Sequence, residues 1–265
     1  MLADAIAPGH PSWLLPSGTI EGLERSSDET VRARLDALRA GPLRIAVLAD
    51  HDTSQADVVL QTIGGWLPHR TRSPSSCAQG TNPNPPRPGT YAVEAPGASS
   101  VDAWLAFPLP PGDTGSRASA ELLVAALTAR GGLLEHALGA GLARSWGAKV
   151  LESARAPALA VWIGSAQGSL DAAVAEARVL FDRLRQEGLT EADRTRALAK
   201  IADARLESTL DPKARLVALW RGDTDMPPSG FPGLEEIKAF AARTLREEAL
   251  TIVASRPPRG AARAP

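Results

Sequence analysis

The hydrophobic residues in the rear part of the chain follow two different spacings. Between positions 101 and 109 every second residue is apolar, which is typical of a strand with one buried face, and Trp104 falls on the opposite face. The alternating residues are Val101, Ala103, Leu105 and Phe107. Further strands are predicted over 90–94, 148–153, 158–164 and 249–254, and the second and third of these could pair as a hairpin.

Apolar residues three or four positions apart predict helices between these strands. We expect a long helix over 118–138, which Gly131 and Gly132 divide or bend, because glycine weakens helix interiors. Ser169 is expected to cap a helix that runs to Gly188. Thr190 and Asp193 resemble a capping box before the next helix, which passes through Ile201 and Leu206 until Pro212 interrupts it. The last two helices are expected over 211–220 and 234–245.

A proline-rich segment separates a short front piece from this rear domain. Five prolines between positions 74 and 88, with almost no apolar residue among them, predict an extended linker. In the front piece we expect a helix with Val31, Leu35 and Leu38 on one face, a strand over 43–48 and a helix over 58–66. The predicted divisions are therefore a front piece over 1–71, a linker over 72–90, a rear domain over 91–258 and a tail over 259–265.

The composition is that of an ordinary soluble globular protein. Of the 265 residues, 44% are hydrophobic and 22% charged, and 29 basic residues nearly balance 30 acidic ones. Because this balance provides no excess positive field, nucleic acid is not an expected partner. The single Cys77 excludes an internal disulfide and a thiolate zinc cluster. We see no apolar run long enough to span a membrane and no signal peptide, which leaves a cytoplasmic location or, for a truncated chain, a periplasmic one.

Several short strings occur in the order and spacing of a known family. His10-Pro11 precedes the segment LRIAVLADHD at 43–52, and Trp66-Leu67-Pro68 ends the next predicted helix. Gly-Leu-Ala-Arg follows at 141–144, and Glu-Gly-Leu-Thr-Glu-Ala-Asp at 187–193. In these strings the chain resembles the pitrilysin/insulinase-type zinc metallopeptidases, which include mitochondrial processing peptidases, insulin-degrading enzymes and core proteins of the respiratory cytochrome complex.

This resemblance implies an α+β fold that spans most of the chain. The rear domain resembles the family's second lobe, a mostly antiparallel sheet with helices packed on one face, and the front piece resembles the end of a similar first lobe. The strands and zinc helix that precede the His-Pro loop in the family are missing, so we expect the chain to begin inside the first lobe. Because a truncated sheet exposes an unpaired edge, we expect the front piece to rest on the rear domain or to need a partner.

The residues that bind zinc in the family have no counterparts here. Family enzymes bind the metal through His-x-x-Glu-His on one helix and a distant glutamate. This chain has histidine only at 10, 51, 69 and 136, and no two of them can share one helix face. Glu135-His136 has Gly132 where the first histidine would stand, and we interpret it as a surface helix position. We therefore expect no catalytic residue, metal ligand or cofactor in this chain, and zinc only in a catalytic partner half.

One residue is a candidate for contact with a peptide substrate. In the family's second lobe an arginine and a tyrosine, seven positions apart, hold the substrate backbone and the oxyanion of the reaction. Arg144 stands in the place of the tyrosine and Ala137 in that of the arginine, so the pair does not transfer to this sequence. Arg144 could still bind a peptide carbonyl or carboxylate, and the alternative is a solvated arginine beside Trp146.

Three other patterns are weaker candidates for chemistry. Asp50-His51-Asp52 follows a predicted strand and suggests a metal site or a general base, but the family resemblance makes it a turn. The string at 164–169 fits neither a phosphate loop nor a nucleophile elbow, and is better interpreted as a strand-to-helix turn. Six tryptophans are scattered along the chain, most of them as expected core or lobe-interface residues rather than an aromatic platform.

The resulting hypothesis is a non-catalytic half or subunit that helps a catalytic half to enclose peptide substrates. Its expected partners are a catalytic peptidase half or subunit and a peptide, in a possible homodimer or heterodimer. A structural or assembly protein of the same fold, like the respiratory core proteins, is the alternative. An unrelated α+β ligand-binding domain is a third possibility.

Overall fold

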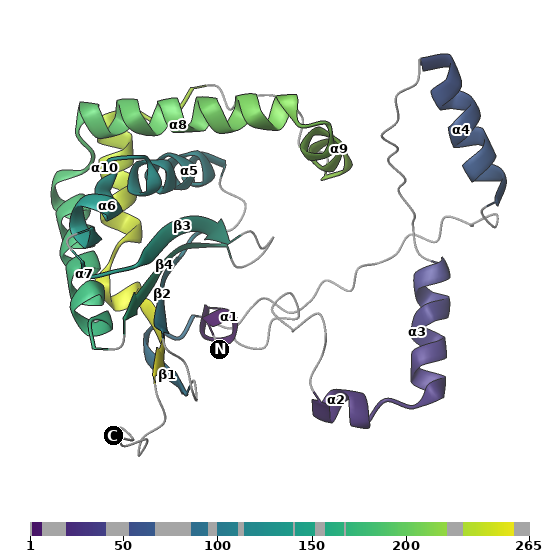
Figure 1. Cartoon of the computed structure of the whole chain (residues 1–265), viewed down its shortest axis with the longest axis horizontal. Helices are drawn as coiled ribbons and strands as arrows, with labels where there is room; N and C mark the ends of the chain where they lie inside the picture. Colours follow the sequence, from purple (N-terminus) through teal and green to yellow (C-terminus); the bar gives the residue numbers. More distant parts are fainter. Residues whose placement is uncertain are drawn as a thin grey trace. The chain divides into compact units, whose positions relative to one another are not determined.

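The chain, shown in Figure 1 as a computed structural model, consists of two compact units. The structure describes residues 2–6, 20–40, 53–66, 86–94, 100–110, 114–139, 141–151, 157–166, 168–221 and 230–256. The first unit comprises residues 1–14, 82–204 and 227–265, and the second comprises 15–81 and 205–226. The strand predicted over 43–48, the string at 50–52 and most of the predicted linker lie outside the described residues.

The first unit is built on a five-stranded sheet in the order β1-β5-β2-β4-β3. Its strands are β1 (Gly89–Glu94), β2 (Ser100–Pro108), β3 (Ser145–Leu151), β4 (Ala158–Ala166) and β5 (Thr251–Arg256). Only β1 and β5 run parallel, and the other neighbouring pairs are antiparallel. The mostly antiparallel α+β fold is therefore confirmed, as is the predicted hairpin of β3 and β4.

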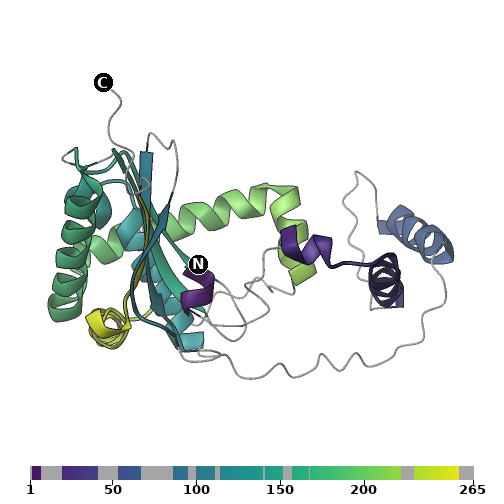
Figure 2. The same ribbon diagram turned by 90° about the horizontal axis from the view of Figure 1, so that it is seen from below.

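Helices cover one face of this sheet and enclose the main core. They are α5 (Thr114–Thr128), α6 (Leu133–Leu138), α7 (Leu170–Glu187) and α10 (Leu234–Thr244). Figure 2 shows α7 and α10 on one side of the sheet, and the short helix α1 (Leu2–Ile6) on the other. There Ile6 packs in a small second cluster with alanines of β2 and β4. Helix α1 and the short 3₁₀ helix η2 (Glu247–Ala249) are elements that the sequence did not predict.

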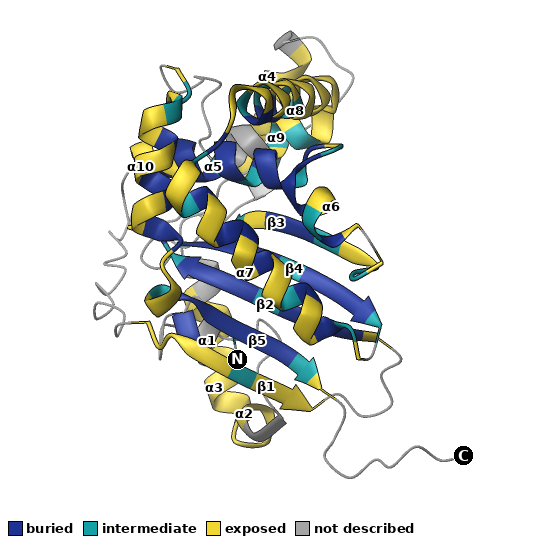
Figure 3. Cartoon of the chain, turned by 90° about the vertical axis from the view of Figure 1, so that its left-hand side faces the viewer, coloured by how far each residue is buried: buried dark blue, intermediate teal, exposed yellow. Residues whose placement is uncertain are grey.

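The alternation predicted for β2 is confirmed by its burial. Val101, Ala103, Leu105 and Phe107 are all nearly inaccessible to solvent. Phe107 meets Phe181 of α7 edge to face, with ring centroids 5.2 Å apart. Figure 3, viewed from the helix side, shows β2 and β4 buried behind α7, whereas β1 at the sheet margin is exposed.

The predicted helix boundaries are largely confirmed. Helix α5 ends and α6 begins on either side of Gly131, whose φ of 62° lies in the left-handed region. Asp193 and Thr190 exchange the hydrogen bonds of a capping box at the start of α8 (Glu191–Leu210). The prediction for Ser169 is wrong in one respect. It occupies the N-cap position of α7, but its hydroxyl donates to the Ala166 carbonyl and accepts no helix N–H.

The described part of the second unit consists mainly of helices. They are α2 (Ile20–Glu24), α3 (Asp28–Ala40), α4 (Thr53–Trp66) and α9 (Pro212–Arg221), together with the end of α8 from Arg205 onward. Ser27 accepts a hydrogen bond from the Thr30 N–H and so caps α3. Val31 and Leu35, on its apolar face, are 50% and 47% exposed.

Candidate functional site

Arg144 lies at the end of a short loop that joins α6 to β3. The backbone N–H of Arg144 donates a 2.8 Å hydrogen bond to the Gly164 carbonyl on β4. The carbonyl of Leu142 accepts a 2.7 Å hydrogen bond from the Ser165 hydroxyl, and the Ala143 N–H donates to the carbonyl of Leu138 at 3.3 Å. These three bonds fix the loop to α6 and β4, while the Arg144 side chain remains exposed.

The local sequence explains this loop. Gly141 has a φ of 86°, a left-handed conformation that glycine adopts without strain. The next two residues, Leu142 and Ala143, are half-buried and pack against the main core. The string at 141–144 therefore makes a turn, anchors it with two apolar side chains and presents an arginine to solvent. Among the described residues no carboxylate is paired with this guanidinium.

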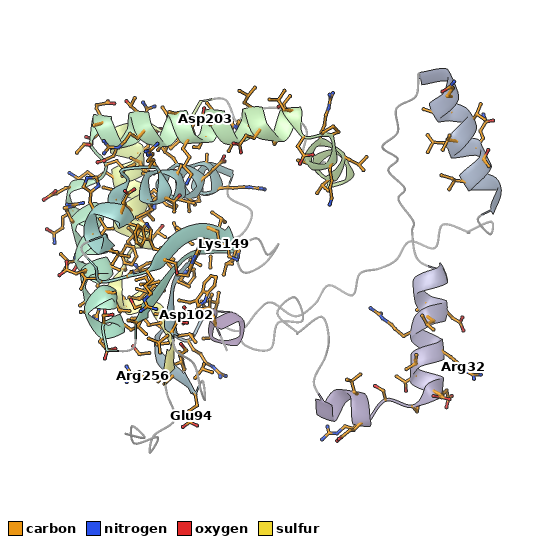
Figure 4. All side chains as sticks on the ribbon, viewed as in Figure 1. Arg32, Glu94, Asp102, Lys149, Asp203 and Arg256 are labelled. Carbon is orange, nitrogen blue, oxygen red and sulfur yellow. The ribbon has the colours of Figure 1, made fainter. Side chains whose placement is uncertain are left out.

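Strand β3, which follows Arg144, forms an edge of the sheet. It pairs with β4 on one side, and no described strand lies on its other side. Residues that point toward the helices, Trp146, Ala148 and Val150, pack on the main core and hold the strand in place. Lys149 points to the opposite face, where Figure 4 shows it on the side away from α7.

Two tryptophans meet on this opposite face. Trp104 of β2 and Trp162 of β4 are partners in the register, and their rings lie 5.7 Å apart with a 34° tilt. The Lys149 ammonium lies 5.1 Å from the centre of the Trp104 ring, within the range of a cation–π contact. Both indoles are half-buried. The sequence places Trp104 on this face by alternation, but Trp162 stands in a continuous apolar run whose faces cannot be separated.

The side chains of Glu135 and His136 both contact backbone groups just before their own helix. A Glu135 carboxylate oxygen accepts the Gly131 N–H at 2.8 Å, and His136 Nδ1 lies 2.8 Å from the Gly132 carbonyl. Both side chains are exposed, which confirms the interpretation of a surface helix position. Over the ranges that the structure describes, no three His, Cys, Asp or Glu residues lie close enough to hold a metal ion. The other histidines and Cys77 are outside these ranges.

A separate pocket of about 400 Å³ lies beside the other sheet edge. It is lined by Pro88, Gly89, Thr90, Arg178, Glu247, Glu248, Leu250 and Ile252. Arg178 and Glu247 form an ion pair there, which links α7 to η2. The arginine is thus already neutralised by a neighbour, and the lining contains no nucleophile next to a base.

The mostly antiparallel sheet, its open edge at β3 and the helix layer together define a lobe of two-layer α+β architecture. No family model and no curated protein matches the sequence. Among solved structures the chain is similar to the peptidase M16 inactive domain from Pseudomonas fluorescens (17% identity, 97% of this chain, 64% of that chain, TM-score 0.73). It is also similar to a protease from Helicobacter pylori (13% identity, 97% of this chain, 65% of that chain, TM-score 0.76).

A third similar structure is that of complex III₂ from Candida albicans with Inz-5 bound (13% identity, 96% of this chain, 64% of the matched chain, TM-score 0.73). The chain therefore has the fold of the insulinase-like M16 peptidases, and the resemblance found in the sequence is confirmed at the level of the fold. The present chain spans slightly less than two thirds of the length of each of these three matched chains. No helix within the described ranges is long and apolar enough to cross a bilayer.

Proposed function

We propose that this chain is the non-catalytic half or subunit of an insulinase-like zinc metallopeptidase. Its partner would be a catalytic half that carries His-x-x-Glu-His, and the two together would enclose peptide substrates. The proposal depends on one combination, the fold of an M16 inactive domain in a sequence without the His-x-x-Glu-His motif. A half without a zinc site can still supply chamber wall and peptide contacts.

Arg144 is the residue that we propose for contact with the peptide. Its guanidinium offers five N–H donors, which can bind a carbonyl or a carboxylate of an extended peptide. One hydrogen bond from its own backbone N–H and two from the preceding residues fix the loop, so the side chain starts from a fixed point beside the open edge of β3. A merely solvated arginine would be equally exposed. A role in peptide contact is distinguished from it by whether replacing Arg144 weakens peptide binding.

The experiment for the function uses the full chain with an affinity tag, expressed in its native cell. We expect the purified chain alone to contain no stoichiometric zinc and to cleave no peptide. We expect the captured complex to contain a zinc-binding subunit with His-x-x-Glu-His and to cleave peptides. Tight one-to-one zinc together with peptidase activity in the chain alone would overturn the proposal.

The role of Arg144 is tested in that complex with Arg144→Ala and Arg144→Lys. Loss of a hydrogen bond from a charged group should raise KM for a peptide by about tenfold, with a smaller change in kcat, and lysine should restore part of the loss. Arg183→Ala, an exposed arginine on α7, is the matched control. Equal KM values for all variants would mean that Arg144 is only solvated.

A structural or assembly role is the second candidate. It is favoured by the similarity to a chain of complex III₂ from Candida albicans, at a TM-score of 0.73. Stable isolation of the tagged chain in a stoichiometric complex without a His-x-x-Glu-His subunit, and without peptidase activity, would favour this role over the first.

We also propose the sequence division into a front piece (1–71), a linker (72–90), a rear domain (91–258) and a tail (259–265), with a front piece that depends on the rear domain. Burial of Ile6 against β2 and β4 supports this dependence for the first residues of the front piece. Limited proteolysis within 72–90 is the test. Release of a folded, monomeric front piece would contradict it.

A further inference from the structure

Strand β1 forms the second edge of the sheet. It pairs with β5 on one side, and no described strand lies on its other side. Figure 3 shows this strand exposed at the sheet margin. Its sequence, Gly-Thr-Tyr-Ala-Val-Glu, is rich in residues that favour strands, and it contains neither the lysine nor the proline that commonly protects an edge. The edge of β1 is therefore suited to pairing with another chain.

The main chain of β1 alternates in direction along this edge. The Gly89 N–H donates to the Leu250 carbonyl at 3.0 Å, and the parallel register places Gly89 opposite Thr251. In a ladder, residues that bond to the neighbouring strand alternate with residues that direct both N–H and C=O groups away from it. The outward residues of β1 are therefore Thr90, Ala92 and Glu94.

A second copy of β1 fits this edge in one antiparallel register. Identical strands related by a twofold axis run antiparallel, and outward residues of one strand must lie opposite outward residues of the other. With the axis at Ala92, this residue faces its own counterpart, and Thr90 faces Glu94 of the second copy. Moving the axis by one residue would place Glu94 or Thr90 opposite a position outside the strand, and fewer hydrogen bonds would form.

The side chains also match in this register. Tyr91 lies opposite Val93 of the second copy, on the sheet face away from the main core. Pairs of an aromatic and a β-branched residue stabilise sheets, and Val93 is 36% exposed without such a partner. Like charges do not meet, because Glu94 is the one charged residue of the strand and lies opposite Thr90.

The pocket beside Thr90 supplies a counter-charge for Glu94. Thr90 is the register partner of Ile252, which packs in the main core, so its side chain points to the helix side and lines the pocket with Arg178. Glu94 of a second copy, opposite Thr90, would extend toward this pocket. Arg178 binds Glu247 through Nη2, and its other guanidinium nitrogens can donate to the incoming carboxylate.

The pocket has no excess of negative charge that would repel this carboxylate. Its two acidic residues, Glu247 and Glu248, form ion pairs with Arg178 and Arg246. Main-chain direction, side-chain pairing and charge thus favour the same occupant of this edge, a second copy of the chain.

We propose that β1 is the twofold interface of a homodimer, in which the two sheets join through antiparallel β1 strands and Glu94 of each copy pairs with Arg178 of the other. This inference goes beyond the proposed function, since it concerns the sheet edge remote from Arg144 and requires no catalytic partner. One short strand from each copy buries less area than a stable interface needs, so we expect a dissociation constant in the micromolar range.

Sedimentation velocity of the full chain, from about 1 μM to about 200 μM, measures this association. We expect a reversible change from monomer to dimer. Ala92→Pro removes an outward N–H that the register requires, and edge strands tolerate proline. This variant should therefore raise the dissociation constant by about tenfold or more.

The ion pair is tested by a double-mutant cycle. Glu94→Gln and Arg178→Ala should each raise the dissociation constant by about threefold, and the double variant should add little to either. Glu235→Gln, at an exposed position on α10, is the matched control and should leave the constant unchanged. Additive effects of the two substitutions would contradict the pairing of Glu94 with Arg178.

A chemical cross-link tests the register itself. In a chain with Cys77→Ser, Ala92→Cys should place two thiols next to each other across the axis, because opposite Cα atoms of a hydrogen-bonded pair lie about 5.5 Å apart. A short bismaleimide should then join the two copies. Asp203→Cys, at an exposed position on α8, should give little cross-linked product under the same conditions.

The outcomes separate this inference from the proposed function. A chain that stays monomeric at every concentration would overturn the inference, as would equal cross-linking at positions 92 and 203. A dimer that a folded Ala92→Pro variant still forms would also overturn it. If Ala92→Pro lacks the thermal transition of the wild type, the cross-link and the double-mutant cycle decide. A monomer that captures a zinc-binding subunit would leave the proposed function intact, and a dimer that captures none would contradict only that function.

Discussion

The ammonium of Lys200 on α8 donates hydrogen bonds to both the carbonyl and the hydroxyl oxygen of Thr128, each at 2.6 Å. Thr128 is the last residue of α5, where carbonyl groups have no partner within the helix. A cation at this end also complements the negative pole of the helix dipole. Burial lowers the pKa of Lys200 below its ordinary value of 10.5. The contact fixes α8 to the helix layer of the first unit.

Replacing this lysine should therefore loosen α8. We expect Lys200→Met, which keeps most of the aliphatic stem, to reduce the free energy of unfolding by about 1 to 2 kcal/mol. Urea unfolding at pH 7 measures the change. Lys213→Met, at an exposed position on α9, is the control and should be neutral. Equal stability of both variants would mean that the contact with Thr128 contributes nothing.

Asp193 should make the first unit sensitive to acid. Burial raises the pKa of its carboxyl, but hydrogen bonds from the Thr190 hydroxyl and N–H and the charge of Arg196 outweigh burial and hold it below 3.8. The unfolded chain therefore binds more protons as pH falls through about 4, and the stabilisation present above that pH is lost in stronger acid.

The test replaces this carboxylate by an amide. Asp193→Asn should reduce the free energy of unfolding by about 1 to 2 kcal/mol at pH 7. It should also make the decrease of that free energy between about pH 5 and about pH 3 less steep. Asp203→Asn, on the exposed side of α8, should leave the acid profile of the wild type unchanged. An Asp193→Asn variant with the wild-type acid slope would contradict this account.

A methyl group on Gly147 should displace the Trp162 ring. We expect Gly147→Ala to destabilise the first unit by about 1 to 3 kcal/mol, because the ring fills the space that the new Cβ requires. Tryptophan fluorescence should shift to longer wavelength as the indole becomes more hydrated. Gly64→Ala, in α4 of the second unit, adds the same methyl where no described atom lies within 4 Å, apart from its chain neighbours and the backbone of its own helix. It should instead stabilise that helix, by up to about 1 kcal/mol.

The edge-to-face contact of Phe107 and Phe181 should be measurable as a coupling energy. Phe181→Ala should cost about 3 to 5 kcal/mol, since the ring is 97% buried and leaves a cavity. A double-mutant cycle with leucine at both positions should give a coupling of about 0.5 to 1.5 kcal/mol. Val179→Ala, on the same helix but 62% exposed, should change stability by less than about 0.5 kcal/mol.

Local patterns in the sequence predicted most of the elements of the first unit, for identifiable reasons. Strand β2 alternates because only one of its faces meets the main core, and Gly131 separates α5 from α6 because its φ is positive. Strand β3 begins three residues before its predicted start. Ser145, Trp146 and Gly147 resemble a loop, since glycine at 147 reflects the neighbouring Trp162 ring and not a turn.

Contacts between distant segments could not be predicted from the sequence. The parallel pairing of β1 with β5, the packing of Ile6 on the sheet and the meeting of Trp104 with Trp162 all depend on the order of strands. The sequence did not place Arg144 directly before a strand, because the predicted start of β3 was at 148 instead of 145. That this strand is an edge became visible only with the complete sheet, and the role of Arg144 stays a prediction.

The position of β5 has a consequence for synthesis on the ribosome. This strand comes after all the other described strands in the sequence, yet it lies between β1 and β2 in the sheet. Until residues 251–256 leave the exit tunnel, β1 has no pairing partner among the described strands, and one side of β2 is open. The nascent chain should therefore stay exposed to chaperones and proteases until this strand has been synthesised, and loss of this one strand would leave the sheet in two pieces.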